Sequence, residues 1–533
     1  MIIQNPIIKG FNPDPSICRV GDDYYIATST FQWFPGVQIH HSRDLKNWEL
    51  IARPLNRVSQ LNMLGVPDSG GVWAPCLTYD NGIFYLIYTN VLSYGYFRDH
   101  MNYLVTARDI CGDWSEPIYL NSSGFDPSLF HDDDGRKWLV NMKLGNRIGE
   151  NTFEGILLQE YNPDLKRLVG PIKNIFKGTE LELTEGPHLY KRNGYYYLMT
   201  AEGGTSYEHA VTLARAENID GPYELHPENP ILTAYGTDHG TALQKAGHAS
   251  IVQGNGDDWF MVHLCGRPVA GTGRCILGRE TAIQRVEWRD DGWPYLAGGG
   301  RTPATQIEVD DSYAGSGSAT RKLAYSMHDD FDNDRLDFHF QTLRAPIGRD
   351  MSLKERPGYL RLYGGYSLSA QFQQSLVARR QQAFSYTAVT CVEFEPETCQ
   401  QLAGLICYYD TQNYYYLRVS YDEELGGKCL GVIANFDGDT SASMQQKDNI
   451  PINSAARVFM KVIVEGRDLN FFYSLDKYSW LPIGDTYDAS TLSDDARSPL
   501  WGFTGAFVGI CCQDLSGLRK YADFDYFSYI ENE

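Results

Sequence analysis

The chain lacks any hydrophobic run that approaches the roughly 18 residues of a membrane-spanning helix. Its start, MIIQNPIIKGFNPDPS, lacks the basic residues and long apolar stretch that open a secretory signal peptide. Basic residues are in deficit, because 46 Lys and Arg face 67 Asp and Glu, which gives a formal net charge of −21. Since a phosphate backbone needs a basic surface, this balance argues against nucleic acid. We therefore expect neither a membrane nor a nucleic-acid partner.

The sequence also lacks the cysteine pattern of a disulfide-stabilised protein. Its eleven cysteines include no Cys-x-x-Cys pair, and their odd number does not fit a closed set of bridges. Cys511 and Cys512 lie in an apolar run, which is typical of buried thiols. With no signal peptide in view, this pattern favours a reducing compartment, and we expect the chain to be cytoplasmic. A Gly-x-Ser-x-Gly nucleophile motif is also absent.

Aromatic and turn-forming residues are abundant, and over the first 300 residues they form a five-fold repeat. Each unit has a short segment, then a tight turn built on Gly with Asp or Asn, then an aromatic-rich strand. The segments are centred on residues 15, 75, 127, 187 and 249, so the steps are 60, 52, 60 and 62 residues. Units of this length with several short strands are typical of propeller blades. We predict a five-bladed β-propeller over residues 1–302; the alternative, a β-sandwich with accidental similarity, does not explain the five-fold agreement.

A change of composition follows the repeats. Residues 303–326 are polar, include Ala314-Gly315-Ser316-Gly317-Ser318, and are predicted to be a connector. Residues 327–533 contain alternating strands such as 414–419 and 458–464, with no competing helical period. We predict a second domain there, so the fold class is all-β, a five-bladed β-propeller followed by a β-sandwich.

The repeats also bring acidic residues together. In a propeller the first strand of each blade lines the central channel, so equivalent positions meet at one mouth. Asp14, Asp126, Glu185 and His248 lie at or beside these positions, whereas Ala74 shows that the fold itself needs no acid there. Glycoside hydrolysis needs one carboxylic acid for the leaving oxygen and one carboxylate for water or carbon, and a third acid can raise the pKa of the first. Turn capping by Asp is the alternative for any single segment, and the residues alone assign no individual roles.

Four motifs carry a resemblance to a known family: Asn12-Pro13-Asp14-Pro15-Ser16, Trp73-Ala74-Pro75, Phe125-Asp126-Pro127-Ser128 and Thr184-Glu185-Gly186-Pro187-His188. They resemble the blade motifs of glycoside hydrolase family 43, and nearly the whole chain is similar to its two-domain β-xylosidases. The resemblance implies an inverting mechanism with Asp14 as general base and Glu185 as general acid. Asp126 would orient Glu185 and tune its pKa.

The same resemblance implies an exo-acting enzyme that releases β-1,4-linked D-xylose from the non-reducing ends of xylo-oligosaccharides. Two alternatives stay open. One is an α-L-arabinofuranosidase, or both activities together, because the two sugars present similar hydroxyls around the scissile bond. The other is a carbohydrate-binding propeller without catalysis, which would not need a crowded carboxyl cluster that is costly to desolvate.

Further site residues are implied by the resemblance. Phe31 and Trp73 resemble the aromatic walls of the sugar pocket, Arg279 a contact to sugar hydroxyls, and Phe507 a residue that the second domain lends to close the pocket. Core packing for the aromatics and a wall salt bridge for Arg279 are the alternatives. His248 is the candidate ligand of a hydrated Ca²⁺ or another divalent cation, with a simple hydrogen-bonded channel histidine as the alternative. No organic cofactor is expected, and the resemblance favours a homo-oligomer, either a dimer or a tetramer.

Overall fold

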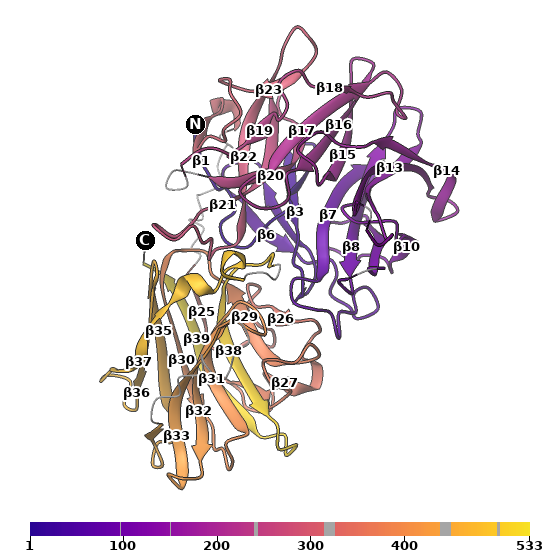
Figure 1. The fold of residues 1–533 in the computed structure, drawn as a ribbon. Helices are drawn as coiled ribbons and strands as arrows, with labels where there is room; N and C mark the ends of the chain where they lie inside the picture. Colours follow the sequence, from indigo (N-terminus) through magenta and orange to yellow (C-terminus); the bar gives the residue numbers. More distant parts are fainter. Residues whose placement is uncertain are drawn as a thin grey trace.

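The computed structural model describes residues 1–95, 97–149, 151–238, 243–313, 326–436, 449–497 and 502–532. Over these residues the chain forms β-strands and a few short 3-10 turns, without an α-helix. Figure 1 shows two bodies, with the N-terminal residues in indigo to pink and the C-terminal residues in orange to yellow. No helix in the described part of the chain is long and apolar enough to cross a membrane. The predicted all-β class is confirmed.

The N-terminal body is a ring of five antiparallel sheets, each built from one stretch of the sequence. Turns such as Asn81-Gly82 and Asn193-Gly194, with positive φ at both residues, join the first two strands of a blade as predicted. The five blades are β2 (Ser16–Val20), β3 (Asp23–Thr28), β5 (Gln38–Ser42) and β6 (Glu49–Ala52); β7 (Gly71–Asp80), β8 (Ile83–Val91), β9 (His100–Ala107) and β10 (Ile118–Asn121); β11 (Ser128–His131), β12 (Lys137–Leu144), β13 (Phe153–Asn162) and β14 (Arg167–Phe176); β15 (Glu185–Arg192), β16 (Tyr195–Glu202), β17 (Ala210–Ala216) and β18 (Glu224–Leu225), with β19 (Leu232–Thr233) also paired to β17; and β20 (Gln244–Gln253), β21 (Trp259–Gly266), β22 (Arg279–Trp288) and β23 (Pro294–Leu296).

A short sheet outside the blades joins the start of the ring to its end. Strand β1 (Ile2–Gln4) pairs with β24 (Gln306–Glu308), and Tyr313 accepts a hydrogen bond from the backbone N–H of Asn255 at 2.6 Å. The propeller therefore continues past residue 302, and the first part of the expected connector packs against the ring. The segment Ala314–Ser318, also assigned to that connector, lies outside the described residues.

The C-terminal body consists of two antiparallel sheets whose inner faces share one apolar core, as expected for a sandwich. All eleven cysteines of the chain are unpaired, and both Cys511 and Cys512 are buried as predicted. The first sheet has the order β27 (Met351–Ser352), β28 (Leu360–Tyr363), β39 (Tyr521–Glu531), β30 (Ser385–Glu393), β35 (Val458–Glu465), β36 (Asp468–Ser474) and β37 (Leu481–Asp488), with β25 (Met327–Asp329) beside β39; the second has the order β29 (Ser375–Arg380), β38 (Phe507–Asp514), β31 (Gln401–Tyr408), β32 (Tyr414–Asp422), β33 (Gly427–Asn435) and β34 (Ile450–Pro451).

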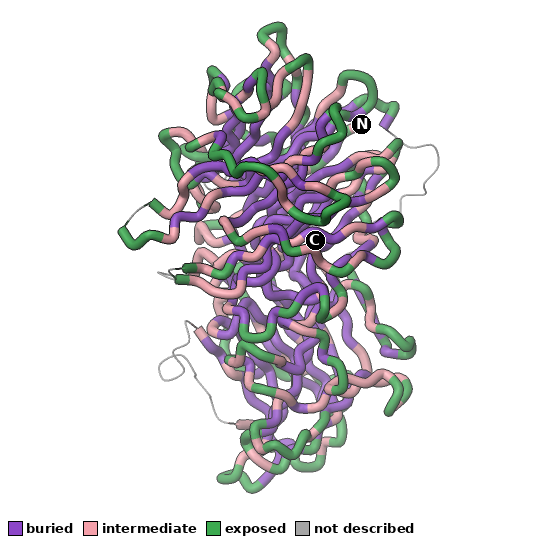
Figure 2. The backbone as a smooth tube through the Cα atoms, turned by 90° about the vertical axis from the view of Figure 1, so that its right-hand side faces the viewer, coloured by how far each residue is buried: buried purple, intermediate pink, exposed green. Residues whose placement is uncertain are grey.

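The two bodies are joined by buried contacts, and Figure 2 shows buried backbone running from one into the other. Strand β26 (Thr342–Leu343) of the second body pairs with β4 (Trp33–Phe34) of the first. The buried guanidinium of Arg344 donates to the carbonyl of Val66 and to Asp68, both at 2.7 Å. Because a buried ion must keep its partners, the two domains are held in one arrangement.

At one point the backbones of the two domains touch through glycine. A Cβ added to Gly278 would lie 2.8 Å from the carbonyl oxygen of Thr504, and one added to Gly505 would lie 2.8 Å from that of Leu277. Real Cβ atoms essentially never come this close to another heavy atom, so only glycine fits at either position. This contact lies next to Arg279 and Phe503, which both reach the site described below.

Candidate active site

The five blades share one backbone feature at the mouth of the channel. Asp14, Ala74, Asp126, Gly186 and His248 have φ values of 55°, 30°, 52°, 56° and 46°. Residues other than glycine rarely adopt this conformation, which costs roughly 1–3 kcal/mol and persists where the surroundings fix it. In the second, fourth and fifth blades the pairing of the inner strand shifts register at the same place. The repeat thus places five equivalent left-handed residues at the channel mouth, three of them beside a shift in strand register.

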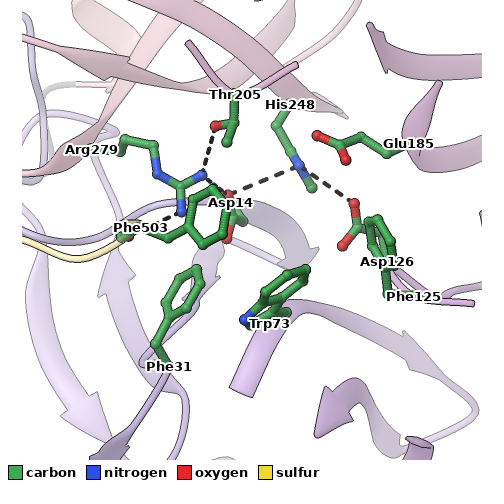
Figure 3. A pocket seen from close by; sticks show the side chains of 10 residues that line it. All are labelled: Asp14, Phe31, Trp73, Phe125, Asp126, Glu185, Thr205, His248, Arg279 and Phe503. Atoms are coloured by element: carbon green, nitrogen blue, oxygen red, sulfur yellow. Dashed lines mark hydrogen bonds and ion pairs between the residues drawn. The ribbon is translucent and has the colours of Figure 1, made fainter. Parts of the chain in front are cut away.

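One pocket gathers seven of the eight predicted site residues. Figure 3 shows these side chains pointing toward one another, together with three further lining residues. The pocket is lined by Asp14, Phe31, Trp73, Phe125, Asp126, Glu185, Thr205, His248, Arg279 and Phe503.

The prediction for Phe507 was wrong. This residue is only 1% exposed, and its ring stacks on Trp33 with 3.7 Å between ring centroids and lies 6.1 Å from the ring of Phe11. Because Phe507 is the first residue of β38, it is fixed in the core between the domains, behind the pocket wall.

Phe503, four residues earlier, is the side chain that the second domain lends to the pocket. Its ring centroid lies 6.0 Å from that of Phe31 and 5.5 Å from that of Trp73. The backbone N–H of Phe503 donates to Ser69 Oγ at 3.0 Å, and its carbonyl accepts from Arg279 Nη2 at 3.2 Å. Phe503 and Phe507 flank Gly505 in the same segment, and the sequence carries no signal that tells which of them faces the sugar.

Two further lining residues were not predicted. Thr205 Oγ1 accepts a hydrogen bond from Arg279 Nη1 at 2.9 Å, and Phe125 meets the ring of Trp73 edge-on at 5.4 Å. Phe125 immediately precedes Asp126 in a motif used above, so its position was available as a signal. Thr205 follows the last strand residue, Glu202, in an irregular turn, where no repeat pattern points to it.

Asp14 is held in its charged form. Arg279 Nη1 lies 2.8 Å from Asp14 Oδ1, and Ser29 Oγ donates to Oδ2 at 2.6 Å. Burial by itself raises the pKa of Asp14, but Arg279, His248 and Ser29 together outweigh it, and the pKa falls below its ordinary value. An ionised carboxylate of this kind can accept a proton from water.

Glu185 is held in its protonated form. Burial, reinforced by the negative charge of Asp14, raises the pKa of Glu185 to about 8. The pKa of Asp126 is raised as well, by burial first and then by Glu185 and Asp14, while its Oδ2 accepts the backbone N–H of Gly186 at 3.0 Å. The pocket therefore contains an acid and a base at neutral pH, which is the separation of roles that two-carboxylate catalysis requires.

His248, the predicted metal ligand, lies near two carboxylates of the pocket. Its Nδ1 lies 3.9 Å from Asp14 Oδ1 and 4.0 Å from Asp126 Oδ2. Burial lowers the pKa of His248, while the negative charge of Asp14 opposes this shift. Within the part of the chain that the structure describes, no three His, Cys, Asp or Glu side chains are grouped to hold an ion. One nitrogen does not fit the oxygen preference of Ca²⁺, so the predicted cation would have to be held mainly by water.

The fold and the site together indicate a glycoside-cleaving propeller protein. The propeller has five blades, and its channel mouth holds paired carboxylates in an aromatic pocket. Residues 3–294 match the model of glycosyl hydrolases family 43, and residues 328–530 match that of the beta xylosidase C-terminal concanavalin A-like domain. The chain belongs to glycosyl hydrolase family 43, as its motifs predicted.

Three relatives place the chain within the family. It is 52% identical over 543 residues to a Beta-xylosidase of Bacillus subtilis (strain 168), with 100% of each chain covered. It is 50% identical to Xylosidase/arabinosidase 43B of Humicola insolens, with 99% of this chain and 97% of the relative covered. The crystal structure of xylan beta-1,4-xylosidase from Bacillus halodurans C-125 has a TM-score of 0.94 and 52% identity, covering 99% of this chain and 100% of the other.

Proposed function

We propose that this protein is an exo-acting, inverting β-xylosidase that releases D-xylose from the non-reducing ends of β-1,4-linked xylo-oligosaccharides. The observation that carries the proposal is the pairing of a charge-stabilised Asp14 with a Glu185 of raised pKa in one pocket. The xylosidase names of relatives that match this chain over its full length support the choice of sugar.

The reaction follows from the two protonation states. Asp14 removes a proton from a water molecule as the water oxygen bonds to the anomeric carbon. The bond between that carbon and the leaving oxygen breaks, and Glu185 gives its proton to the leaving oxygen. Xylose leaves with inverted configuration together with the shortened chain, and exchange with solvent restores the proton on Glu185 and removes the one on Asp14.

The neighbouring groups keep these roles apart. Arg279 holds Asp14 deprotonated, and its ion pair orients the carboxylate. Asp126 accepts the N–H of Gly186, the residue after the acid, so it fixes the backbone that carries Glu185. The negative charges of Glu185 and Asp14 add to the effect of burial and raise the pKa of Asp126 further above its ordinary value.

Exo action is supported by the way the pocket is closed. Phe31 and Trp73 from the first two blades and Phe503 from the second domain pack against one another through their rings. An aromatic wall of this kind packs against the apolar face of one sugar ring and blocks a chain that would continue past it. The substrate therefore has to enter by its end.

α-L-Arabinofuranosidase activity is the second candidate, favoured by the 50% identity to a relative named Xylosidase/arabinosidase 43B. We include in the proposal a cytoplasmic location, supported by eleven unpaired cysteines, and a homo-oligomeric state, either a dimer or a tetramer. Size-exclusion chromatography with light scattering measures the oligomeric state, and cell fractionation tests the location.

The proposed reaction is tested by following an aryl β-xyloside by proton NMR. We expect α-xylose to appear first, because inversion of a β-linkage gives the α-anomer. Asp14→Asn and Glu185→Gln should each lower kcat/KM by at least about 1,000-fold, with Glu185→Gln least harmful for a leaving group of low pKa. Glu180→Gln, an exposed neighbour of Glu185, is the matched control. β-Xylose as the first product, or an active Asp14→Asn variant, would contradict the assigned roles. Rates measured in parallel on an aryl α-arabinofuranoside test the second activity.

A further inference from the structure

A buried carboxylate outside the pocket contacts the segment that leads to Glu185. Glu202 is the last residue of β16 and is 0% exposed. Its neighbour Ala201 is the cross-strand partner of Glu185, and Thr184 Oγ1 donates to Glu202 Oε1 at 3.0 Å. The carboxylate of Glu202 is therefore bonded to the residue directly before the acid.

Glu202 also holds the far end of that segment. Residues 177–184 connect β14 to β15 without a strand or helix of their own. The backbone N–H of Thr179 donates to Glu202 Oε1 at 3.0 Å, and the Thr179 hydroxyl donates to Oε2. The carbonyl of Glu182 accepts from the N–H of Gly203 at 3.0 Å. Both ends of the segment are thus fixed to the end of β16.

The segment needs such an anchor because its own conformation is costly. Glu182 and Leu183 have φ values of 61° and 54°, two consecutive left-handed residues directly before Thr184 and Glu185. Each costs roughly 1–3 kcal/mol and persists only where contacts fix it. Side-chain packing does not supply these contacts, because Leu181 and Leu183 are 40% and 39% exposed.

Burying the carboxyl group of Glu202 costs free energy. Burial raises the pKa of Glu202, against the hydrogen bonds from Thr179 and Thr184 that favour its charged form. Among the described residues no lysine or arginine forms an ion pair with this carboxylate. A buried carboxyl group without a cation costs several kcal/mol, so an apolar residue would be the cheaper choice if the site only had to be filled.

We propose that Glu202 is a positioning residue that fixes residues 177–184 and thereby aims the carboxyl group of Glu185 at the leaving oxygen. The proposal rests on the proposed function, since it deepens the role of the acid. A general acid has to lie about 2.6–3.2 Å from the atom that it protonates, and a misplacement of about 1 Å can cost on the order of 100-fold in rate. Loosening the segment should weaken protonation while leaving Asp14 and the sugar pocket in place.

The test is Glu202→Gln, measured on aryl β-xylosides whose leaving phenols have pKa values from about 4 to about 10. We expect kcat/KM to fall by about tenfold or more for the poorest leaving group and by less than about threefold for the best, which needs little protonation. The logarithm of kcat/KM should then depend more steeply on leaving-group pKa than in the wild type. Merely structural damage would lower all rates alike.

Two further variants complete the design. Glu154→Gln is the control, because Glu154 is a partly buried glutamate at the start of β13 in the third blade whose carboxylate pairs with Lys143. It should leave the steepness unchanged. Thr179→Val removes one hydrogen bond to Glu202 from the loop side and should increase the steepness by a smaller amount, with a melting temperature close to wild type. This second variant tests the proposal even where Glu202→Gln folds poorly.

An equal loss across the series in a folded Glu202→Gln variant, or no loss at all, would overturn the proposal. If Glu202→Gln does not fold, an unchanged slope in Thr179→Val would overturn it. Failure of the wild type to cleave any β-xyloside would contradict the proposed function instead. The positioning role is then measured on aryl α-arabinofuranosides, because their leaving oxygen needs a proton in the same way.

Discussion

Phe503 and Phe507 lie four residues apart, and their replacement by alanine should have opposite effects. Phe503 faces the sugar pocket, whereas Phe507 is buried behind it against Trp33. We expect Phe503→Ala to lower kcat/KM with a small change in stability. We expect Phe507→Ala to lower stability, with its effect on kcat/KM the smaller of the two.

The magnitudes follow from burial. A phenyl ring that covers about 50 Å² of an apolar sugar face contributes about 1.3 kcal/mol at about 25 cal/mol per Å². Its loss corresponds to roughly tenfold in kcat/KM. Removing a fully buried phenylalanine costs about 3–5 kcal/mol, because a cavity remains. In a domain of this size that loss lowers the melting temperature by on the order of 10 °C.

The assay combines kcat/KM on an aryl β-xyloside with calorimetric melting for both variants. Phe503→Leu is the control, because it keeps apolar volume at the pocket wall and should recover part of the loss. The reasoning fails if Phe507→Ala loses tenfold in kcat/KM at an unchanged melting temperature. It fails equally if Phe503→Ala retains the wild-type kcat/KM.

Two further predictions concern pH and metal. Because Glu185 must be protonated and its pKa is about 8, kcat/KM should decline as the pH rises through about 8. Because Asp14 must be ionised and its pKa lies below the ordinary value, the acidic decline should begin only below the usual range of an aspartate; a midpoint near pH 6 would contradict this assignment. If the channel cation predicted from the resemblance acts at His248, dialysis against EDTA should lower activity, Ca²⁺ should restore it, and His248→Ala should abolish the response. Full activity after EDTA would leave His248 as a channel residue beside the two carboxylates, without a functional cation.

The propeller could be predicted from the sequence because the same pattern of segment, turn and strand occurs five times. Turn pairs such as Asn193-Gly194 recur at nearly constant spacing, and each fixes a hairpin by local chemistry alone. The end of the propeller was harder to place, since β24 is a strand of three residues whose partner β1 lies about 300 residues away. Local patterns carry no information on such a pairing.

The site could be predicted as far as the repeat and the family motifs reach. Asp14, Asp126 and His248 occupy equivalent left-handed positions of three blades, so their convergence follows from the symmetry of the ring. Phe503 and Thr205 lie in irregular segments, where the direction of a side chain depends on tertiary contacts that no periodicity encodes. The error at Phe507 has the same origin.

The glycine contact between the domains limits which domains can be combined in this enzyme. Gly278 and Gly505 leave no room for a Cβ on either side, and Arg279 and Phe503 flank them in the pocket. If this propeller were joined to the β-sandwich of another protein, it would supply Gly278 but not the glycine that faces it from the second domain. An exchange of whole domains would therefore preserve this contact only if the incoming domain also carries glycine on its side. We therefore expect the sugar pocket to change by single substitutions in either domain, with the Gly278–Gly505 contact kept.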